Sequence, residues 1–318
     1  HSSSPVPAGA QYTICETQPA GYADGPVGGV TNSITIASLS STGSANNNFP
    51  EVLGSISGKV FADFGSGTAG NNNNGTQDAS EPGIGSDTAN SGVPVTLTGT
   101  PSAGPALPAG GITVYTNASG DYSFEDLFPG SYTITQTAIP AALGVHNNGI
   151  NTAGAVTPAG TPGTAGAVGT NTISALVLAA GSVSPANNFA KMPVTAITGT
   201  VYIDLNRNST KEDAVTDGRV GGGVLSLYQA ATCTGTPVAT TTTGADGAYI
   251  FSAVSAGLAY AICQTQPLGY GDASVNPGTG AVTPGANVIT IATLASTGSV
   301  GNDFGETIGS IAGFVYRD

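Results

Sequence analysis

The chain has 318 residues, of which 48 are Gly and only 8% are charged, and its formal net charge is −13. Its six Lys and Arg residues cannot form the clustered basic face that nucleic acids require, so nucleic acid is excluded as a partner. No run of about 18 apolar residues occurs, so we expect no membrane span in this segment. Val, Ile, Tyr and Phe recur in short alternating runs, which is typical of an all-β chain with long turn-rich loops.

One sequence pattern occurs three times, at residues 9–22, 130–144 and 257–270. Each copy combines a strand of the type YTIC or YTIT with a Pro/Gly corner, and an apolar strand follows it. Each copy then leads to Asn-Asn-Phe or Asn-Asp-Phe, and these triplets end at Phe49, Phe189 and Phe304. Self-similarity at a domain-sized period indicates one folding unit repeated in series.

The predicted domain boundaries follow from this repeat. We expect the C-terminal half of a β-sandwich repeat at 1–53, a complete cysteine-free repeat at 54–191, a complete disulfide-bearing repeat at 196–306 and the first strand of a further repeat at 308–318. The Gly/Ala/Thr/Pro-rich stretch 153–170 predicts a long surface loop. The short linkers favour stiff junctions.

Within each complete repeat, an alternating first strand precedes an Asn/Asp-rich loop, a second strand, a hairpin with Gly at its turn and a closing strand. Short strands with turn signals every 8–12 residues or so predict tandem Greek-key β-sandwiches, prealbumin- or immunoglobulin-like, in a linear array. The expected opening, second and closing strands lie at 55–63, 93–99 and 172–180 and at 196–204, 223–229 and 289–295.

The chain has three cysteines, Cys15, Cys233 and Cys263. We expect a disulfide between Cys233 and Cys263, which would close a loop of about 30 residues and contribute about 3–4 kcal/mol in the chain-entropy model. Cys15 occupies the same place in its repeat as Cys263, so we expect it to be unpaired in this segment, with its partner upstream of residue 1. The alternative is three buried free thiols. A disulfide favours an oxidising, extracellular compartment.

The Asn/Asp-rich loop after each first strand is the strongest chemical signal. Ca²⁺ takes about six to eight hard oxygen ligands, and a loop with oxygen-bearing side chains at alternate positions, a sharp turn and a later acid supplies them. The candidate ligands are Asp63, Asn72, Asn74, Thr76, Asp78 and Glu81 in the second repeat and Asp204, Asn206, Asn208, Thr210, Glu212, Asp213 and Asp217 in the third. The alternative is a solvated loop held by Asx turns, without a metal. We expect Ca²⁺ as the cofactor.

Catalysis finds no support in the sequence. The chain has only two histidines, and nothing marks a nucleophile elbow or a triad, so we expect that it is not an enzyme. An autocatalytic covalent cross-link between Lys59 and Asn187 or Asn188 would need a buried acid to transfer the proton. The first repeat has Glu16 at the expected position, but the second repeat has Gln136 there. We therefore expect no such cross-link.

The ordered motifs GSISGKVFAD, NNGTQDASEPG, NASGDYSFEDLFPGSYTITQT, ETQPAGY and NNF together resemble the Sdr B-like (serine–aspartate repeat B-type) domain of bacterial surface proteins, a relative of the collagen-adhesin B-type domain. The resemblance covers nearly the whole chain. It implies prealbumin-like β-sandwiches strung as stalks or fibres at the cell surface, with Ca²⁺ that rigidifies some members.

These patterns favour an extracellular structural protein, a stalk or surface filament whose partners are copies of itself. The alternative is an adhesin that binds a glycan or a host protein through its loops. Cys15 to Cys263 and Ile56 to Ile311 each span about 250 residues, so two repeat types are expected to alternate.

The ends of the sequence allow two interpretations. The chain is a window from a longer array, or its last residues add as a strand to the first repeat of a neighbour. The first repeat lacks about 60 residues relative to the others, which favours the window. The candidates for strand donation are Gly309, Ile311, Phe314 and Tyr316.

Overall fold

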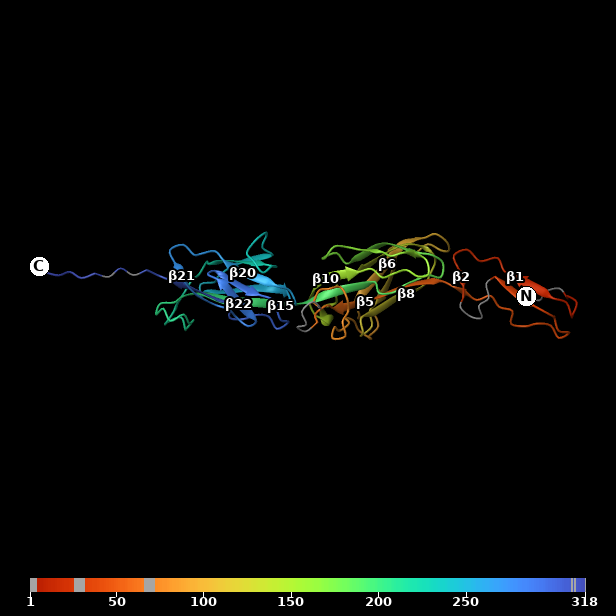
Figure 1. The fold of residues 1–318 in the computed structure, drawn as a ribbon, viewed down its shortest axis with the longest axis horizontal. Helices are drawn as coiled ribbons and strands as arrows, with labels where there is room; N and C mark the ends of the chain where they lie inside the picture. The colour runs from red at the N-terminus through yellow and green to blue at the C-terminus, as the bar shows by residue number, and fades with distance from the viewer. Residues whose placement is uncertain (1–4, 26–31, 66–71, 310, 312, 318) are drawn as a thin grey trace. The chain divides into compact units, whose positions relative to one another are not determined.

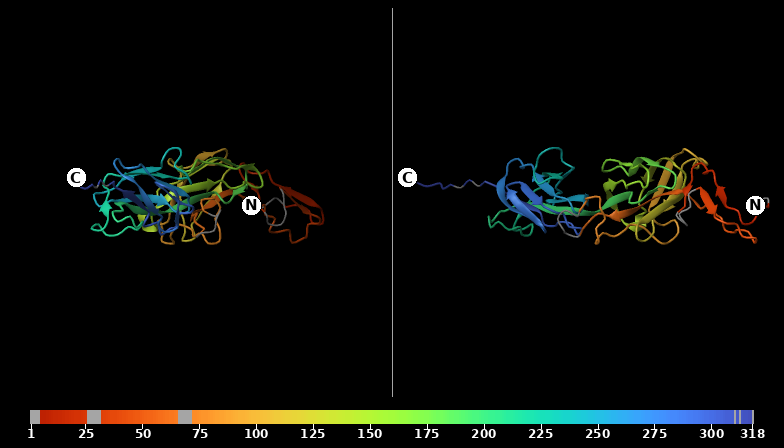
Figure 2. Two further views of the ribbon diagram at one scale, coloured as in Figure 1. Left: turned by 60° about the vertical axis from the view of Figure 1, so that its left-hand side comes forward. Right: turned by 45° about the vertical axis from the view of Figure 1, so that its right-hand side comes forward.

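The computed structural model describes residues 1–318 except 1–4, 26–31, 66–71, 310, 312 and 318. The described residues form β-strands and loops, and their only helical element is the single 3₁₀ turn η1 (Ala141–Leu143) (Figure 1). Two further views show the same strands and loops (Figure 2). The all-β prediction is confirmed. No helix in the described part of the chain is long and apolar enough to cross a membrane.

The chain divides into two compact units. The first comprises residues 1–61, 82–144 and 150–190, and the second comprises 62–81, 145–149 and 191–318. The repeat boundaries derived from the sequence stay predictions.

The segment before residue 54 contains two small antiparallel pairs, β1 with β3 and β2 with β4. Ile14 of β1 is 36% exposed, whereas Ile134 and Ile262, at the same place in the other repeats, are fully buried. Among the described residues of this segment, no second sheet covers this face of the β1–β3 pair as one does in the other repeats. The strands are β1 (Tyr12–Cys15), β2 (Ala23–Asp24), β3 (Ser33–Ile36) and β4 (Glu51–Val52).

The second repeat contains two layers of strands. In one layer β5 pairs with β8 and, in parallel, with β14; the other has the order β11-β13-β9-β6-β7. The chain passes between the layers several times, since β5 and β8 lie in one layer and β6, β7 and β9 lie in the other, as in a Greek-key sandwich. The strands are β5 (Gly54–Ala62), β6 (Pro94–Pro101), β7 (Ile112–Tyr115), β8 (Asp121–Leu127), β9 (Gly130–Gln136), β10 (His146–Thr152), β11 (Gly160–Thr161), β12 (Thr164–Ala165), β13 (Thr172–Leu178) and β14 (Val183–Ser184).

The third repeat has the same two-layer plan. In one layer β15 pairs with β19 and, in parallel, with β24, which pairs with β21; the other has the order β18-β17-β20-β23-β22. The strands are β15 (Asn188–Ile203), β16 (Gly218–Arg219), β17 (Val224–Tyr228), β18 (Ala239–Thr242), β19 (Ala248–Ser255), β20 (Tyr260–Gln264), β21 (Gly271–Asn276), β22 (Ala281–Gly285), β23 (Val288–Ile291) and β24 (Asp303–Thr307).

The core of the third repeat lies between its two layers. Alternate residues of each strand point inward, so Ile197 and Val201 of β15 meet Leu225, Ile262 and Phe304 of the other strands, and all five are fully buried. Side chains of this size each contribute about 1.5–3 kcal/mol when they leave water. Burial of alternating Val, Ile and aromatic residues is thus the physical reason that this sequence folds as a sandwich.

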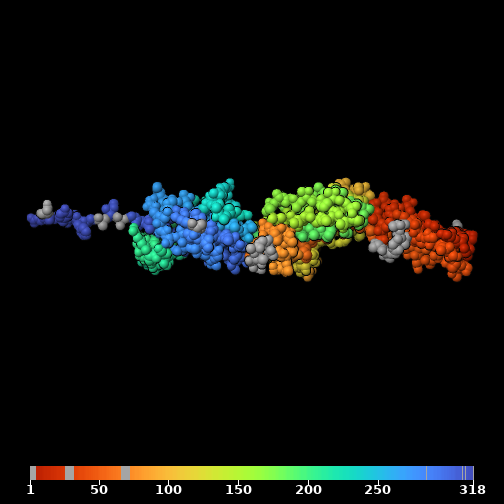
Figure 3. Space-filling view, in the orientation of Figure 1, coloured from red at the N-terminus to blue at the C-terminus, as the bar shows by residue number. Residues whose placement is uncertain are grey.

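Two segments differ from the secondary structure predicted from the sequence. The stretch 153–170 was expected to be a loop, but it contributes the short strands β11 and β12, which pair with β13. In the other segment, the described residues from 309 to 317 contain no strand. There Ile311, Phe314 and Tyr316 are 84–105% exposed. The space-filling view draws the dark blue C-terminal end of the chain as a thin extension (Figure 3).

Candidate functional site

The candidate metal loop of the second repeat begins where β5 ends. Asp63 is fully buried, and its carboxylate accepts hydrogen bonds from the backbone N–H groups of Asn74 at 3.2 Å and Gly75 at 2.7 Å. Burial raises the pKa of Asp63, although these backbone donors partly offset that effect. Gly75 has a φ of +75°, which is why glycine suits the turn that brings its N–H to the carboxylate.

The rest of this loop holds further oxygen atoms close together. Asn74 Oδ1 accepts from the Thr76 N–H at 2.7 Å, and Glu81 Oε2 accepts from the Asp78 N–H at 2.8 Å. Glu81 Oε1 and Asn72 Oδ1 are buried and have no hydrogen-bond partner among the described residues. Burial raises the pKa of Glu81, and the neighbouring carboxylates of Asp63 and Asp78 raise it further.

The third repeat repeats this arrangement after β15. Asp204 accepts from the backbone N–H groups of Asn208 at 3.1 Å and Ser209 at 2.9 Å. Asn206 Oδ1 accepts from the Asn208 N–H at 3.1 Å, and Asn208 Oδ1 accepts from the Thr210 N–H at 2.8 Å. The structure therefore brings Asp204, Asn206 and Asn208 together in successive Asx turns.

The three later acids of this loop take different roles. Glu212 accepts from the side-chain amides of Asn206 at 2.7 Å and Asn208 at 3.0 Å. Asp217 is fully buried; its Oδ2 accepts from the Glu212 N–H at 2.8 Å, and its Oδ1 has no partner among the described residues. Asp213 accepts from the backbone of Thr216 and Val215 instead, and these bonds lower its pKa. Asp213 thus forms a turn of its own.

The donor chemistry of both loops fits a hard cation. Each loop holds a buried carboxylate oxygen without a donor, Glu81 Oε1 or Asp217 Oδ1, and such an atom is costly unless a cation or hydrogen bond satisfies it. Within the described ranges, however, no group of three or more His, Cys, Asp or Glu residues is placed to hold a metal. Much of any coordination would therefore come from amide and backbone oxygens, and Ca²⁺ stays a prediction.

Cys233 and Cys263 form a disulfide with a Cα–Cα distance of 6.0 Å. It ties the loop between β17 and β18 to β20, the strand that pairs with β17. Cys15 is free and exposed, so the alternative of three buried free thiols is wrong for this structure.

Two buried charges were missed by the sequence reasoning. Lys191 is fully buried and donates from Nζ to Asn148 Oδ1 at 2.9 Å. Glu306 is also fully buried, and it accepts from the side-chain amides of Gln264 and Gln266, both at 2.6 Å. Both residues stand two positions after the repeated Asn-x-Phe triplet, and aligning the triplets would have found them.

The side-chain amine of Lys59 contacts the β8 hairpin and not the asparagines that follow β14 among the described residues. Its Nζ lies 2.5 Å from Asp121 Oδ1 and donates to the Ser119 carbonyl at 3.1 Å. Its backbone N–H, not its amine, donates to Asn188 Oδ1 at 2.9 Å. The amine is thus engaged in an ion pair on the outer face of the sheet.

Comparison with known proteins agrees with the resemblance drawn from the motifs. Residues 60–169 match the family described as the SdrD B-like domain. This match supports the resemblance within the second repeat; the resemblance predicted for the rest of the chain stays a prediction. No curated protein sequence matches the chain.

The solved structures to which the chain is similar include two pilins by name. The Bacillus anthracis TIE protein has 15% identity and a TM-score of 0.29, with 94% of this chain and 41% of that chain covered. A Streptococcal ancillary pilin has 13% identity and a TM-score of 0.31, with 94% and 76% covered. GBS52, the minor pilin of Streptococcus agalactiae, has 12% identity and a TM-score of 0.27, with 83% and 99% covered. Values this low carry no conclusion about function.

Proposed function

We propose that this chain is part of an extracellular structural protein, a stalk or filament at the cell surface built from tandem β-sandwiches. The observation that carries the proposal is the repetition of one sandwich plan along the chain, with an SdrD B-like domain at 60–169. Tandem repeats build extended assemblies because each repeat contacts only its neighbours along the chain. The partners are further copies of the same repeat.

The connection between the repeats supports a stalk. Strand β15 spans Asn188–Ile203 with a register shift between Thr195 and Ile197, and the boundary between the two compact units falls inside it, between residues 190 and 191. Residues in a paired strand lose their backbone freedom, whereas a Gly/Ser-rich linker keeps it. A junction of this kind is suited to bear tension.

Immunogold labelling of intact cells tests this proposal. An antibody raised against the recombinant chain should label stalks or filaments outside the cell envelope. Gold confined to the cell interior would contradict the proposal.

We further propose that Ca²⁺ stabilises the loops 63–81 and 204–217. Its ligands would be Asp63, Asn74 and Glu81 in the second repeat and Asp204, Asn206, Asn208 and Asp217 in the third. The support is the buried carboxylate oxygens without donors, Glu81 Oε1 and Asp217 Oδ1. Bound Ca²⁺ would raise the free energy of unfolding by mass action, because the unfolded chain lacks the site.

Thermal unfolding with CaCl₂ and with a chelator tests the metal. We expect a higher midpoint with Ca²⁺ and a smaller gain in Asp217→Asn. The matched control is Asp213→Asn, because Asp213 is engaged in its own turn and its loss should leave the gain intact. An unchanged midpoint in the wild-type protein would remove Ca²⁺ from the proposal while leaving the filament untouched.

A further inference from the structure

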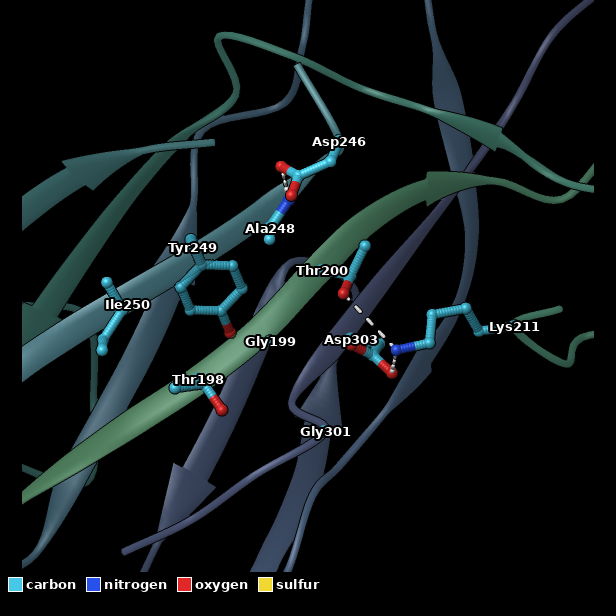
Figure 4. Close-up of a pocket in the computed structure, with 10 residues that line it drawn as sticks. All are labelled: Thr198, Gly199, Thr200, Lys211, Asp246, Ala248, Tyr249, Ile250, Gly301 and Asp303. Atoms are coloured by element: carbon cyan, nitrogen blue, oxygen red, sulfur yellow. Dashed lines mark hydrogen bonds and ion pairs between the residues drawn. The ribbon is translucent and has the colours of Figure 1, made fainter. Parts of the chain in front are cut away.

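The outer face of the sheet that contains β15 carries a hollow of about 540 Å³ (Figure 4). Thr198 and Thr200 project from one face of β15, and they pair in register with Ile250 and Ala248 of β19. Because the side chains of Thr200 and Ala248 are both small, the surface is depressed where these two residues pair. The volume falls in the range of about 300–1,000 Å³ that is usual for small-molecule sites.

A charged pair forms one wall of the hollow. Lys211 reaches it from the loop after β15, and its Nζ lies 2.7 Å from Asp303 Oδ2 and 3.4 Å from Thr200 Oγ1 (Figure 4). Asp303 is only 8% exposed, whereas Lys211 is 33% exposed. An ammonium group has three N–H donors, and these two partners leave one for a ligand.

The other walls add an acceptor and an apolar surface. Asp246 lines the hollow, and its Oδ1 is oriented by the Ala248 N–H at 3.1 Å. Ile250 is 54% exposed, which leaves its side chain free to cover a ligand. The hollow thus offers a cation, a carboxylate, two hydroxyls and one aliphatic face within a single depression.

The second repeat fills the same place with its own side chains. Lys59 and Asp121 stand where the third repeat has Thr200 and Ala248; they pair in register and form an ion pair at 2.5 Å. Both repeats otherwise share the backbone plan of these two strands. The hollow is therefore a difference of side chains and not a consequence of the fold.

We propose that this hollow binds a neutral, hydroxyl-rich ligand, a saccharide. The ammonium group of Lys211 would repel a cationic ligand, and the carboxylates of Asp246 and Asp303 would repel an anionic one. A sugar hydroxyl can accept a hydrogen bond from Lys211 and donate one to Asp246 or a threonine at the same time. The C–H face of the sugar would lie on Ile250. This site does not depend on whether the protein forms filaments.

Saturation-transfer difference NMR on the full chain tests the proposal, with glucose, galactose, mannose and N-acetylglucosamine as probes. We expect at least one of them to give transfer, and Lys211→Met to weaken its binding at least tenfold. The double variant Thr200→Lys with Ala248→Asp installs the ion pair of the second repeat, so it should fold normally and abolish binding. Lys59→Met, in the second repeat, is the matched control and should bind as the wild type does.

Three results would overturn the proposal. The first is no transfer to any of the four sugars. The second is binding that persists in the Thr200→Lys, Ala248→Asp variant with an unchanged thermal midpoint. The third is a positively charged probe, lysine amide, that binds while the sugars do not, because the hollow would then recognise a basic side chain of a protein partner.

Discussion

The second and third repeats place opposite charges at the same buried position. Lys191 follows Phe189 by two residues, and Glu306 follows Phe304 by two residues. Both side chains are fully buried. Neutral side-chain amides form hydrogen bonds with each charged group: Asn148 accepts from the lysine, and Gln264 and Gln266 donate to the glutamate.

The backbone around this position is the same in both repeats. The Asp63 N–H donates to the Lys191 carbonyl at 2.8 Å, and the Asp204 N–H donates to the Glu306 carbonyl at 2.9 Å. The fold therefore specifies the strand pairing here and leaves the charge to each repeat, provided that an amide satisfies it. The same rule explains the hollow, since the outer-face pair also changes while the ladder does not.

The largest expected loss of stability comes from removing the buried phenylalanine that both repeats share at the end of the Asn-x-Phe triplet. Phe189→Ala and Phe304→Ala each remove a fully buried ring, and each should lower the free energy of unfolding of its repeat by about 3–5 kcal/mol. Urea unfolding followed by tyrosine fluorescence measures both. A loss below about 1 kcal/mol at either position would show that the two cores are not equivalent.

The next largest loss of stability should affect the third repeat and leave the second repeat unchanged. Replacing Cys233 and Cys263 by Ser removes a cross-link found only in the third repeat and should destabilise that repeat by about 3–4 kcal/mol. Cys15→Ser is the matched control, because Cys15 is free. Equal losses in the control and the double variant would contradict this assignment.

A smaller effect tests one shared hydrogen bond. Tyr122 donates to the Asn187 carbonyl at 2.6 Å, and Tyr249 donates to the Asn302 carbonyl at 2.7 Å. Changing either tyrosine to Phe leaves a buried carbonyl without this donor, so we expect a loss of about 1–3 kcal/mol at each. Thermal unfolding of the two variants should give matching shifts, and a shift at one position alone would break the equivalence.

The smallest effect per pH unit is an opposite pH dependence of the two repeats. Burial lowers the pKa of Lys191 from 10.5 to about 7; the folded chain therefore loses this proton first, and stability rises as the pH increases from about 7 to 10.5. Burial raises the pKa of Glu306 above 4.5; the folded chain therefore keeps this proton longer, and stability falls as the pH increases from 4.5 through the folded-state pKa. Either slope is at most about 1.4 kcal/mol per pH unit.

Two variants isolate these slopes. Measured in a chelator, Lys191→Met should flatten the alkaline slope only, and Glu306→Gln should flatten the acidic slope only. Urea midpoints across both pH windows give the slopes. If Lys191→Met retained the full alkaline slope, another group would be responsible for it.

The strands of this fold were predictable from sequence because their burial alternates. The expected strand 55–63 corresponds to β5 (Gly54–Ala62), and its inward residues Ile56 and Val60 are fully buried. The short strands β11 and β12 were not predictable, since their Gly/Ala/Thr sequence has no alternation and pairs only because β13 offers an edge.

The candidate sites also differ in how far the sequence predicts them. The Asx turns around Asp63 and Asp204 follow from local spacing, so the sequence located them. The Lys211–Asp303 pair joins residues far apart in the chain, and the hollow exists because Thr200 and Ala248 happen to face each other across two strands. Long-range contacts of this kind leave no local signal.

Electron microscopy of native material released from the cell surface tests the central claim most directly. The account predicts filaments or stalks that the antibody against this chain decorates along their length, with a period set by a pair of repeats. Decorated particles that are single, isolated domains without linear order would contradict it.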